Sequence, residues 1–376
     1  MIRSRLILVI GFAMLASSAH AGDKFVVAGF STKFIEGHTW AIPLGIEAGI
    51  FQKHNLDVEV VTPAFNVHRV GIRENVENPS GGIHATLLAA HGWNVLGEGG
   101  CYTAIAATNH SQASEFIARK GFELKSGLTF AVLGARGSHH QILAALYGVT
   151  GKEEPFAIIS PGVSNLRLMA VRDGVAAGTI APAPQTTVAR EVYGLEVFPI
   201  ENLISEKAIP SLRVQGSRSA LPSSNFFFAD CAQVKRNDRQ VYTRFAMAIK
   251  EIVAFVLDPV NESRVKEIVG RKLGTYDLLD RLPEALKDDK MHRPKGLDIT
   301  DVGKVKEHVE SIKRAMVADI IRQMRTDPAR DGRIPPNIID LALEIHFSGL
   351  KTREEIELIK ARWRKLDEKF FSLLSQ

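Results

Sequence analysis

The stretch Leu128-Thr129-Phe130-Ala131-Val132-Leu133-Gly134-Ala135-Arg136-Gly137-Ser138-His139-His140-Gln141 carries an apolar strand through a glycine-bearing turn into a helix. Ser138, with Gln141 three residues later, forms a capping-box pattern, which predicts that the helix starts there. A helix start has free backbone N–H groups and a positive dipole end, so it can hold an anion or a polar ligand head. Many helices begin this way and bind nothing, so the function depends on what surrounds the turn.

The same succession of strands and helices occurs twice. In the first copy, an apolar strand over 25–30 leads to a helix over 39–54 and to an alternating strand over 57–61. A connection of that length favours parallel pairing of the two strands. Residues 123–200 repeat the pattern, beginning with the strand at 128–133. Two such units joined by short crossings predict an α/β fold of two lobes, with a ligand cleft between them at the carboxyl ends of the strands.

The last third of the chain changes to amphipathic helices. A strand over 225–229 is expected to return the chain to the first lobe, after a loop at 213–224 that is rich in Ser, Gly and Pro. Thr352 and Glu355 form a second capping box at the start of the last helix. The apolar stripes of these helices suit packing against the protein's own core better than a partner surface or a coiled coil. The predicted helices cover residues 238–257, 261–273, 300–324, 336–347 and 351–374.

The amino terminus has the pattern of a bacterial export signal. Arg3 and Arg5 precede an apolar run over 6–15, and the segment closes with Ala-His-Ala at 19–21. The run is too short for an ordinary membrane span, and no later segment offers about 18 uninterrupted apolar residues, so we expect a soluble chain in the periplasm. The predicted divisions are a signal peptide over 1–21, the first lobe over 22–120, the second lobe over 121–215, and a return to the first lobe with a helical segment over 216–376.

Charge and cysteine content exclude several classes of protein. Removing the signal takes the count of basic residues from 47 to 45 against 42 acidic ones, which leaves a net charge of +3. That is too little for a nucleic-acid binder, which carries a concentrated basic stripe. Cys101 and Cys231 lack the Cys-x-x-Cys spacing of metal and redox sites. They could form one disulfide in an oxidising compartment, although we favour two buried thiols that act as small apolar residues.

Two segments resemble a known family, the periplasmic solute-binding proteins of ABC importers for nitrate, sulfonates, taurine and thiamine-precursor pyrimidines. Residues 40–61, which read WAIPLGIEAGIFQKHNLDVEVV, resemble the family's opening helix and strand. Residues 166–178, which read LRLMAVRDGVAAG, resemble a segment of its second lobe. The likeness covers about residues 25–257 and implies a two-lobed α/β binding-protein fold of type II-like topology, with an additional C-terminal helical segment.

The resemblance also implies a function. Its two lobes would close on a small molecule, which the chain would deliver to an ABC importer permease in the inner membrane. Such a site needs no nucleophile, metal or cofactor, so we expect a monomeric binding protein that is not an enzyme. Ala176 stands where the family usually has Asp, and His84 replaces the usual acid of the first-lobe counterpart. These departures concern the class of ligand rather than the fold.

The candidate ligand contacts lie at strand ends and helix starts. Thr86 starts a predicted helix over 86–91, and Tyr102 ends a predicted strand over 95–102. Ser138 could be a helix cap, a ligand contact or both. The full candidate set is Thr32, Phe34, Trp40, Asn66, Thr86, Tyr102, Ser138, His139 and Asn165.

Each candidate also has a structural alternative. Trp40 and Tyr102 could stack on a planar ligand or lie in the core, and Asn66 and Asn165 could bind a ligand or cap turns. The adjacent histidines at 139–140 diverge on a helix, which makes a poor metal site. The sequence contains no Gly-x-Ser-x-Gly elbow, which is the motif that would indicate a serine hydrolase.

A small organic anion or sulfonate is the favoured ligand, because the predicted helix starts at Ser138 and Thr86 would face the cleft. A neutral heteroaromatic held by Trp40 and Tyr102 is the alternative. Two other functions stay open. One is a sensory or partner-docking role for the long helical tail. The other is a pyrimidine-making enzyme, although the cysteine-rich motif used by such relatives is absent from this sequence.

Overall fold

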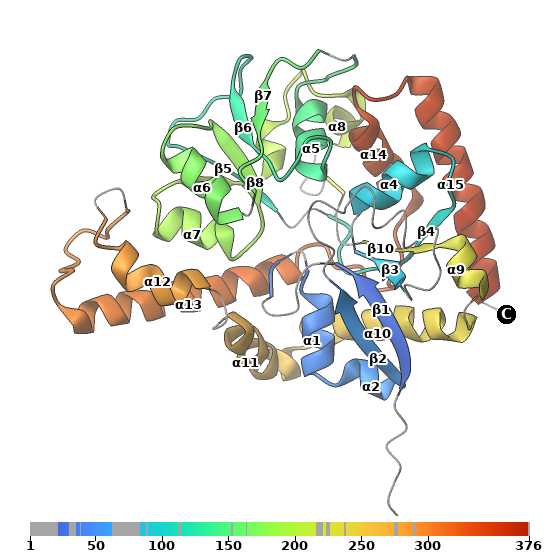
Figure 1. Cartoon of the computed structure of the whole chain (residues 1–376), viewed down its shortest axis with the longest axis horizontal. Coiled ribbons are helices and arrows are strands. Elements are labelled where there is room, and N and C mark those ends of the chain that lie inside the picture. Colours follow the sequence, from blue (N-terminus) through green and yellow to red (C-terminus); the bar gives the residue numbers. More distant parts are fainter. Residues whose placement is uncertain are drawn as a thin grey trace, which may run out of the picture.

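Two lobes, each built around a five-stranded sheet, make up the described part of the chain (Figure 1). The computed structural model describes residues 22–29, 35–37, 39–61, 83–87, 89–111, 114–151, 153–162, 164–215, 221–222, 226–236, 238–273, 277–288 and 291–374. The predicted signal peptide over 1–21 lies outside these ranges. Within them, no helix is both long and apolar enough to cross a membrane.

The first sheet has the strand order β2-β1-β3-β10-β4. β1 pairs in parallel with β2 and β3, whereas β10 is antiparallel to β3 and β4. β10 lies late in the sequence, after the strands of the second sheet, so the chain comes back to the first sheet at this strand. The strands are β1 (Asp23–Ala28), β2 (Leu56–Val61), β3 (Ile83–Thr86), β4 (Tyr102–Ala107) and β10 (Phe226–Asp230).

The second sheet repeats this arrangement, with the order β7-β6-β8-β5-β9. β6 is parallel to β7 and β8, and β5 is antiparallel to β8 and β9. In both sheets the antiparallel strand comes fourth and follows a crossing from the other lobe. The chain passes from the first sheet to the second between Ala107, the last residue of β4, and Glu115, the first residue of β5. The strands are β5 (Glu115–Ala118), β6 (Thr129–Ala131), β7 (Ala157–Ile159), β8 (Gly178–Ala181) and β9 (Glu196–Phe198).

Glycines decide where two of the first-lobe helices end. The predicted helix over 39–54 is divided by Gly49, whose left-handed φ of 72° a residue with a side chain rarely adopts. The predicted strand over 95–102 is wrong, because α4 runs to Gly97 and β4 begins only at Tyr102. The glycines at 97–100 end a helix rather than form a strand. Among the described residues up to 215, the helices are α1 (Ala41–Glu47), α2 (Ile50–Lys53), α4 (Ala89–Gly97), α5 (Ser138–Leu146), α6 (Ser164–Arg172), α7 (Gln185–Glu191), the 3₁₀ helix η3 (Ile200–Leu203) and α8 (Pro210–Gln215).

The five helices predicted for the C-terminal part are confirmed as α10, α11, α13, α14 and α15. In α15, Ile359 and Trp363 are buried against the first lobe, so the apolar stripe is a core surface. The Thr352 N–H donates to Glu355 Oε2 at 2.8 Å and the Glu355 N–H donates to Thr352 Oγ1 at 3.3 Å, which confirms the capping box. This part comprises α9 (Cys231–Arg236), α10 (Arg239–Leu257), the 3₁₀ helix η4 (Pro259–Asn261), α11 (Glu262–Leu273), α12 (Asp277–Ala285), α13 (Val302–Met324), α14 (Pro336–Phe347) and α15 (Arg353–Leu374).

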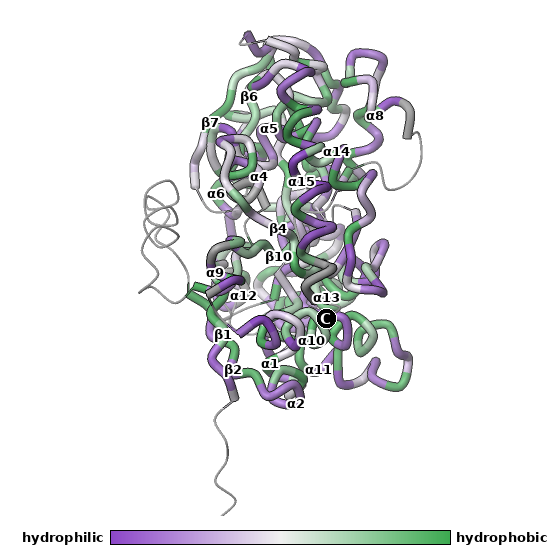
Figure 2. Tube along the Cα trace, turned by 90° about the vertical axis from the view of Figure 1, so that its right-hand side faces the viewer, coloured by the Kyte–Doolittle hydropathy of each residue, from purple (hydrophilic) through white to green (hydrophobic). Residues whose placement is uncertain are grey.

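The hydrophobic core is continuous across the lobes through the C-terminal helices. One apolar cluster contains Phe25 of the first lobe, Val188 of the second lobe and Met316 of α13. Leu341 of α14 belongs to the second-lobe cluster, whereas Leu343 belongs to a first-lobe cluster. In the side view of Figure 2, α14 lies next to α5, and α15 lies next to α4 and β4. The C-terminal segment is therefore an integral part of both lobes.

Cys101 and Cys231 form a disulfide, with their Cα atoms 5.5 Å apart and a sequence separation of 130. The two buried thiols favoured from the sequence are therefore wrong. Cys101 precedes β4 and Cys231 follows β10, two antiparallel strands in which Tyr102 pairs with Asp230. Cys101 and Cys231 are the next pair in this register and therefore lie opposite each other. The Cys231 N–H donates to the Cys101 carbonyl at 3.1 Å.

Replacing both cysteines by serine, C101S/C231S, should lower the free energy of unfolding by about 2–4 kcal/mol, because the cross-link restricts the unfolded chain. The measurement is the urea midpoint, taken with and without a reductant. Reduced wild type should match the double variant, and the variant itself should not respond to the reductant. Equal midpoints for oxidised wild type and the variant would contradict this stabilising role.

Candidate functional site

The two lobes meet through the segments that follow the carboxyl ends of β1 and β8. The Gly37 N–H donates to the Ala183 carbonyl at 2.8 Å, and Gln185 Nε2 donates to Glu36 Oε1 at 2.7 Å. Carboxyl ends of parallel strands are where open α/β sheets place their ligands. This inter-lobe junction is therefore the candidate site.

Arg167 of α6 is the buried cation on the second-lobe side of the junction. Arg167 is buried, with 3% of its surface exposed. One terminal nitrogen, Nη1, donates to the Ile180 carbonyl at 2.9 Å and lies 3.1 Å from His139 Nδ1, while Nη2 donates to Ser164 Oγ at 2.9 Å. These contacts connect the starts of α5 and α6 with the end of β8. The third nitrogen, Nε, has no hydrogen-bond partner in the described part of the chain.

Glu36 supplies the opposing charge from the first lobe. Burial lowers the pKa of Arg167 to about 10, and the negative charge of Glu36 acts in the opposite direction. Arg167 therefore stays cationic at neutral pH. Gln185, which donates to Glu36, has an Oε1 without a partner among the described residues. An unpaired buried donor or acceptor costs about 1–3 kcal/mol. A small solute that accepts a hydrogen bond from Arg167 Nε and donates one to Gln185 Oε1 would therefore stabilise the junction.

The start of α5 differs from the predicted capping box. The N-cap is Gly137, which has no side chain to accept a hydrogen bond, and Ser138 is the first helical residue. The Arg136 N–H donates to His140 Nδ1 at 2.7 Å, and His140 Nε2 lies 2.9 Å from the Glu154 carboxylate. His140 therefore holds the turn that the sequence assigned to Ser138. Among the described residues, no group of three or more His, Cys, Asp or Glu side chains is placed to hold a metal ion.

Three of the predicted contacts, Ser138, His139 and Asn165, lie at the starts of α5 and α6 beside Arg167. Arg167 itself was missed by sequence reasoning. The available signal was a basic residue between apolar neighbours, three positions after Ser164 on the same helix face. The predicted contacts Thr32, Phe34 and Asn66 lie outside the described residues.

Trp40 and Thr86 lie in the interior of the first lobe. Trp40 is 1% exposed, and its Nε1 donates to Asn109 Oδ1 at 3.2 Å. Asn109 in turn donates to the Met324 carbonyl at 3.0 Å. These contacts leave Trp40 no open face for a planar ligand while the lobes are in this arrangement. Thr86 is the last residue of β3 rather than a helix start, so the anion-holding helix start predicted there is wrong.

Tyr102 lies at the opposite edge of the first sheet from the junction. It is the first residue of β4 and pairs with Asp230, the last residue of β10, beside the disulfide. Its predicted place at the carboxyl end of a strand is therefore wrong, because that end of β4 is Ala107. Burial, together with the charge of Asp230, raises the pKa of the Tyr102 hydroxyl.

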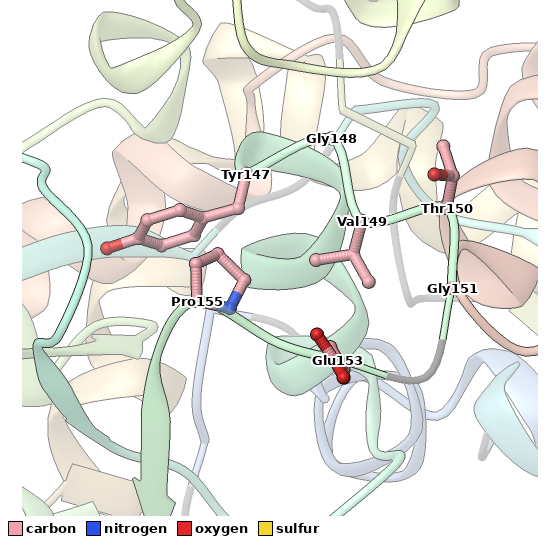
Figure 3. Close-up of a pocket in the computed structure, with 7 residues that line it drawn as sticks. All are labelled: Tyr147, Gly148, Val149, Thr150, Gly151, Glu153 and Pro155. Atoms are coloured by element: carbon pink, nitrogen blue, oxygen red, sulfur yellow. The ribbon is translucent and has the colours of Figure 1, made fainter.

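A surface pocket lies at the C-terminal end of α5, away from the junction (Figure 3). Among the described residues that line it, Glu153 is the only charged one, and Tyr147 and Pro155 supply apolar surface. Ser138 is at the other end of the same helix. The pocket is therefore separate from the cluster around Arg167. The described residues that line it are Tyr147, Gly148, Val149, Thr150, Gly151, Glu153 and Pro155.

Gln323 of α13 fills the space between the lobes next to the candidate site. Its Oε1 accepts the Ala183 N–H at 2.8 Å, and its Nε2 donates to Glu115 Oε2 at 3.2 Å. A Cβ atom added to Gly37 would lie 1.9 Å from this Oε1. Gly37 is thus required by the close approach of a buried amide rather than by its own backbone angles.

Comparisons with known proteins support the fold. No protein-family model matches the chain, and no protein with a curated description matches it. A solved structure of a Bordetella bronchiseptica RB50 protein is similar with a TM-score of 0.57 and 14% identity, and covers 92% of this chain and 99% of its own. At this identity the likeness shows a shared fold.

Two further similar structures are those of periplasmic binding proteins. One is the periplasmic aliphatic sulphonate-binding protein SsuA from Escherichia coli, with 11% identity, coverage of 86% and 99% of the two chains, and a TM-score of 0.44. Another is the periplasmic nitrate-binding protein NrtA from Synechocystis PCC 6803, with 13% identity, coverage of 86% and 97%, and a TM-score of 0.43. The two sheets of this chain have the predicted two-lobed α/β architecture.

Substituting Gly37 by alanine, G37A, should lower the free energy of unfolding by about 2–4 kcal/mol, because the new methyl group displaces the Gln323 amide and breaks its bond to Ala183. G37A/Q323A should recover part of that loss. The measurement is a double-mutant cycle from urea unfolding, with a coupling energy of about 1 kcal/mol or more.

G134A is the matched control for this cycle, because a Cβ at Gly134 meets nothing within 4 Å. It should change the free energy of unfolding little. Additive effects of G37A and Q323A would contradict the proposed contact between these residues.

Proposed function

We propose that the chain is a solute-binding protein that holds a small molecule at the inter-lobe junction and delivers it to an ABC importer permease. The observation that carries the proposal is Arg167, a buried cation at the carboxyl edge of the second sheet whose Nε is unpartnered among the described residues. The two-lobed fold supports it, because ligand sites commonly form between such units. A periplasmic location, through the predicted signal peptide over 1–21, and a monomeric state belong to the same proposal.

The proposed ligand is a small monoanion, such as an organic sulfonate or a carboxylate. Arg167 and the N-termini of α5 and α6 favour negative charge at this edge of the second lobe. Glu36 opposes a second negative charge, because repulsion between like charges is strong in a poorly solvated site. Singly charged anions should therefore bind better than dianions such as sulfate.

A neutral polar heterocycle is the second candidate ligand. The observation in its favour is that the acceptor Gln185 Oε1 and the donor Arg167 Nε both lack partners among the described residues. The positive charge of Arg167 is already opposed by the negative charge of Glu36, so the ligand need not be charged. Trp40 and Tyr102, the aromatic contacts suggested by the sequence, do not support it. Trp40 is enclosed in the core, and Tyr102 lies at the far edge of the sheet.

The other two functions have less support. Cys101 and Cys231 are joined in a disulfide, so neither is a thiol for the enzymatic alternative. The apolar stripe of α15 is buried against the first lobe, so it is not the exposed surface that a docking role would use. A binding role without catalysis is the proposal that agrees with the site.

The test is a thermal-shift screen at fixed protein concentration. A monoanion at 100 times its dissociation constant stabilises the folded state by about 2.7 kcal/mol, which should raise Tm by roughly 3–6 °C. Ethanesulfonate, nitrate and acetate form the monoanion arm, sulfate the dianion arm, and a neutral pyrimidine the heterocycle arm. No shift from any monoanion would contradict the preferred ligand, and a shift from the pyrimidine alone would favour the second candidate.

R167K tests the site itself. It keeps a positive charge but lacks the Nε–H and the planar fork, so binding of an active ligand should weaken at least about 10-fold, on the scale of one charge-assisted hydrogen bond. R119K is the matched control, since Arg119 is an exposed arginine of the same lobe. Unchanged affinity in R167K would contradict the assignment.

A further inference from the structure

α13 lies between the two lobes and contacts both. It packs against α7 of the second lobe on one side and against α11, on the first-lobe side, on the other (Figure 1). Ile312, Met316 and Ile320 of α13 are buried. The same apolar cluster contains Val188 of α7 and Ile268 of α11. Separating the lobes along either face of α13 would expose this apolar surface to water.

Asp319 ties α13 to the second lobe by buried polar contacts. Its Oδ2 accepts from the hydroxyls of Thr186 and Thr187 at 2.7 and 2.9 Å and from Arg190 Nη2 at 3.0 Å, all on α7. Arg322 Nε donates to Oδ1 at 2.9 Å. Burial acts to raise the pKa of Asp319, but the Thr186 bond and the charges of Arg322 and Arg190 outweigh it and lower the pKa. The buried carboxylate is thus ionised and well supplied with donors.

The end of α13 extends these contacts to the first lobe. Gln323 bonds Ala183 of the second lobe and packs where Gly37 of the first lobe has no side chain. Asn109, in the crossing between the lobes, donates to the carbonyl of Met324, and the same Asn109 accepts from the first-lobe tryptophan. Within two turns of one helix, buried hydrogen bonds therefore reach both lobes and the crossing.

α14 makes a second connection. Leu341 and Ile345 pack in the second-lobe cluster, whereas Ile339 and Leu343 pack in a first-lobe cluster. Just after this helix, Ser348 Oγ donates to the carbonyl of a second-lobe residue at 2.8 Å. α13 and α14 pack against different second-lobe helices, α7 and α5. The lobes are thus connected at two places besides the chain crossings.

We propose that α13 is a brace that fixes the angle between the lobes, and that Asp319 and Gln323 are positioning residues for the inter-lobe site. A rotation of one lobe away from the other would remove donors from the buried Asp319 carboxylate and partners from the Gln323 amide. The lobes then keep one angle in the absence of ligand, in contrast to the closure of two lobes on a solute that the resemblance implied. This inference goes beyond the proposed function and is independent of the ligand.

The test measures the distance between two spin labels, one on each lobe, by pulsed electron paramagnetic resonance. V175C lies on the second lobe and M247C on α10 of the first, at residues that are 62% and 54% exposed. The native cysteines are joined to each other, so labels attach to the introduced pair. The protein is refolded from urea to remove any solute that copurifies. The expected result is a single narrow distance distribution without ligand.

D319N/Q323A should broaden or shift that distribution while the far-ultraviolet circular dichroism spectrum stays native, which a merely structural loss of stability would not do. T186A/T187A removes donors from the second lobe without changing α13 and should act in the same direction. E310Q, on the exposed face of α13, is the matched control and should change nothing. A broad or two-peaked distribution in the otherwise wild-type protein would overturn the proposal. So would a narrow distribution that neither D319N/Q323A nor T186A/T187A alters.

Discussion

One buried amide lies at the centre of the contacts that hold the lobes in their arrangement. Gln323 lies where α13 meets both lobes, accepts the Ala183 N–H, and occupies space that Gly37 leaves open. A polar group in such a place must keep its protein hydrogen bonds, because water does not reach it to replace them. The lobe angle that satisfies Gln323 is also the angle at which the charge of Glu36 acts on Arg167.

The repeated topology of the two sheets explains why the candidate site lies where it does. Helices begin shortly after the carboxyl ends of β3, β6, β7 and β8, and the crossings bring the carboxyl edges of the two sheets together. The second lobe contributes a buried cation and two helix N-termini, and the first lobe contributes a carboxylate. The C-terminal helices, which share apolar clusters with both lobes, add the contacts that hold this geometry.

Features formed by residues close together in the chain could be predicted from the sequence. The periodic apolar residues of α13 predicted its helix and buried face, and the Thr352 cap is formed within four residues. Features that join distant segments were not. The Cys101–Cys231 pairing needs β10 beside β4, and the burial of Arg167 needs His139, 28 positions earlier, and the end of β8. The sequence therefore predicted the lobes and the second-lobe helix starts, but not the cation between them.

The most direct test of the central claim, that Arg167 presents a protected donor to a solute at the junction, is the nuclear magnetic resonance signal of its Nε–H in protein labelled with ¹⁵N-arginine. R167K assigns the signal by its disappearance. The account predicts slow exchange with water at neutral pH, because the group is buried, and a change in chemical shift when a stabilising solute saturates the protein. A signal that exchanges as fast as those of exposed arginines, or that does not move at saturation, would contradict it.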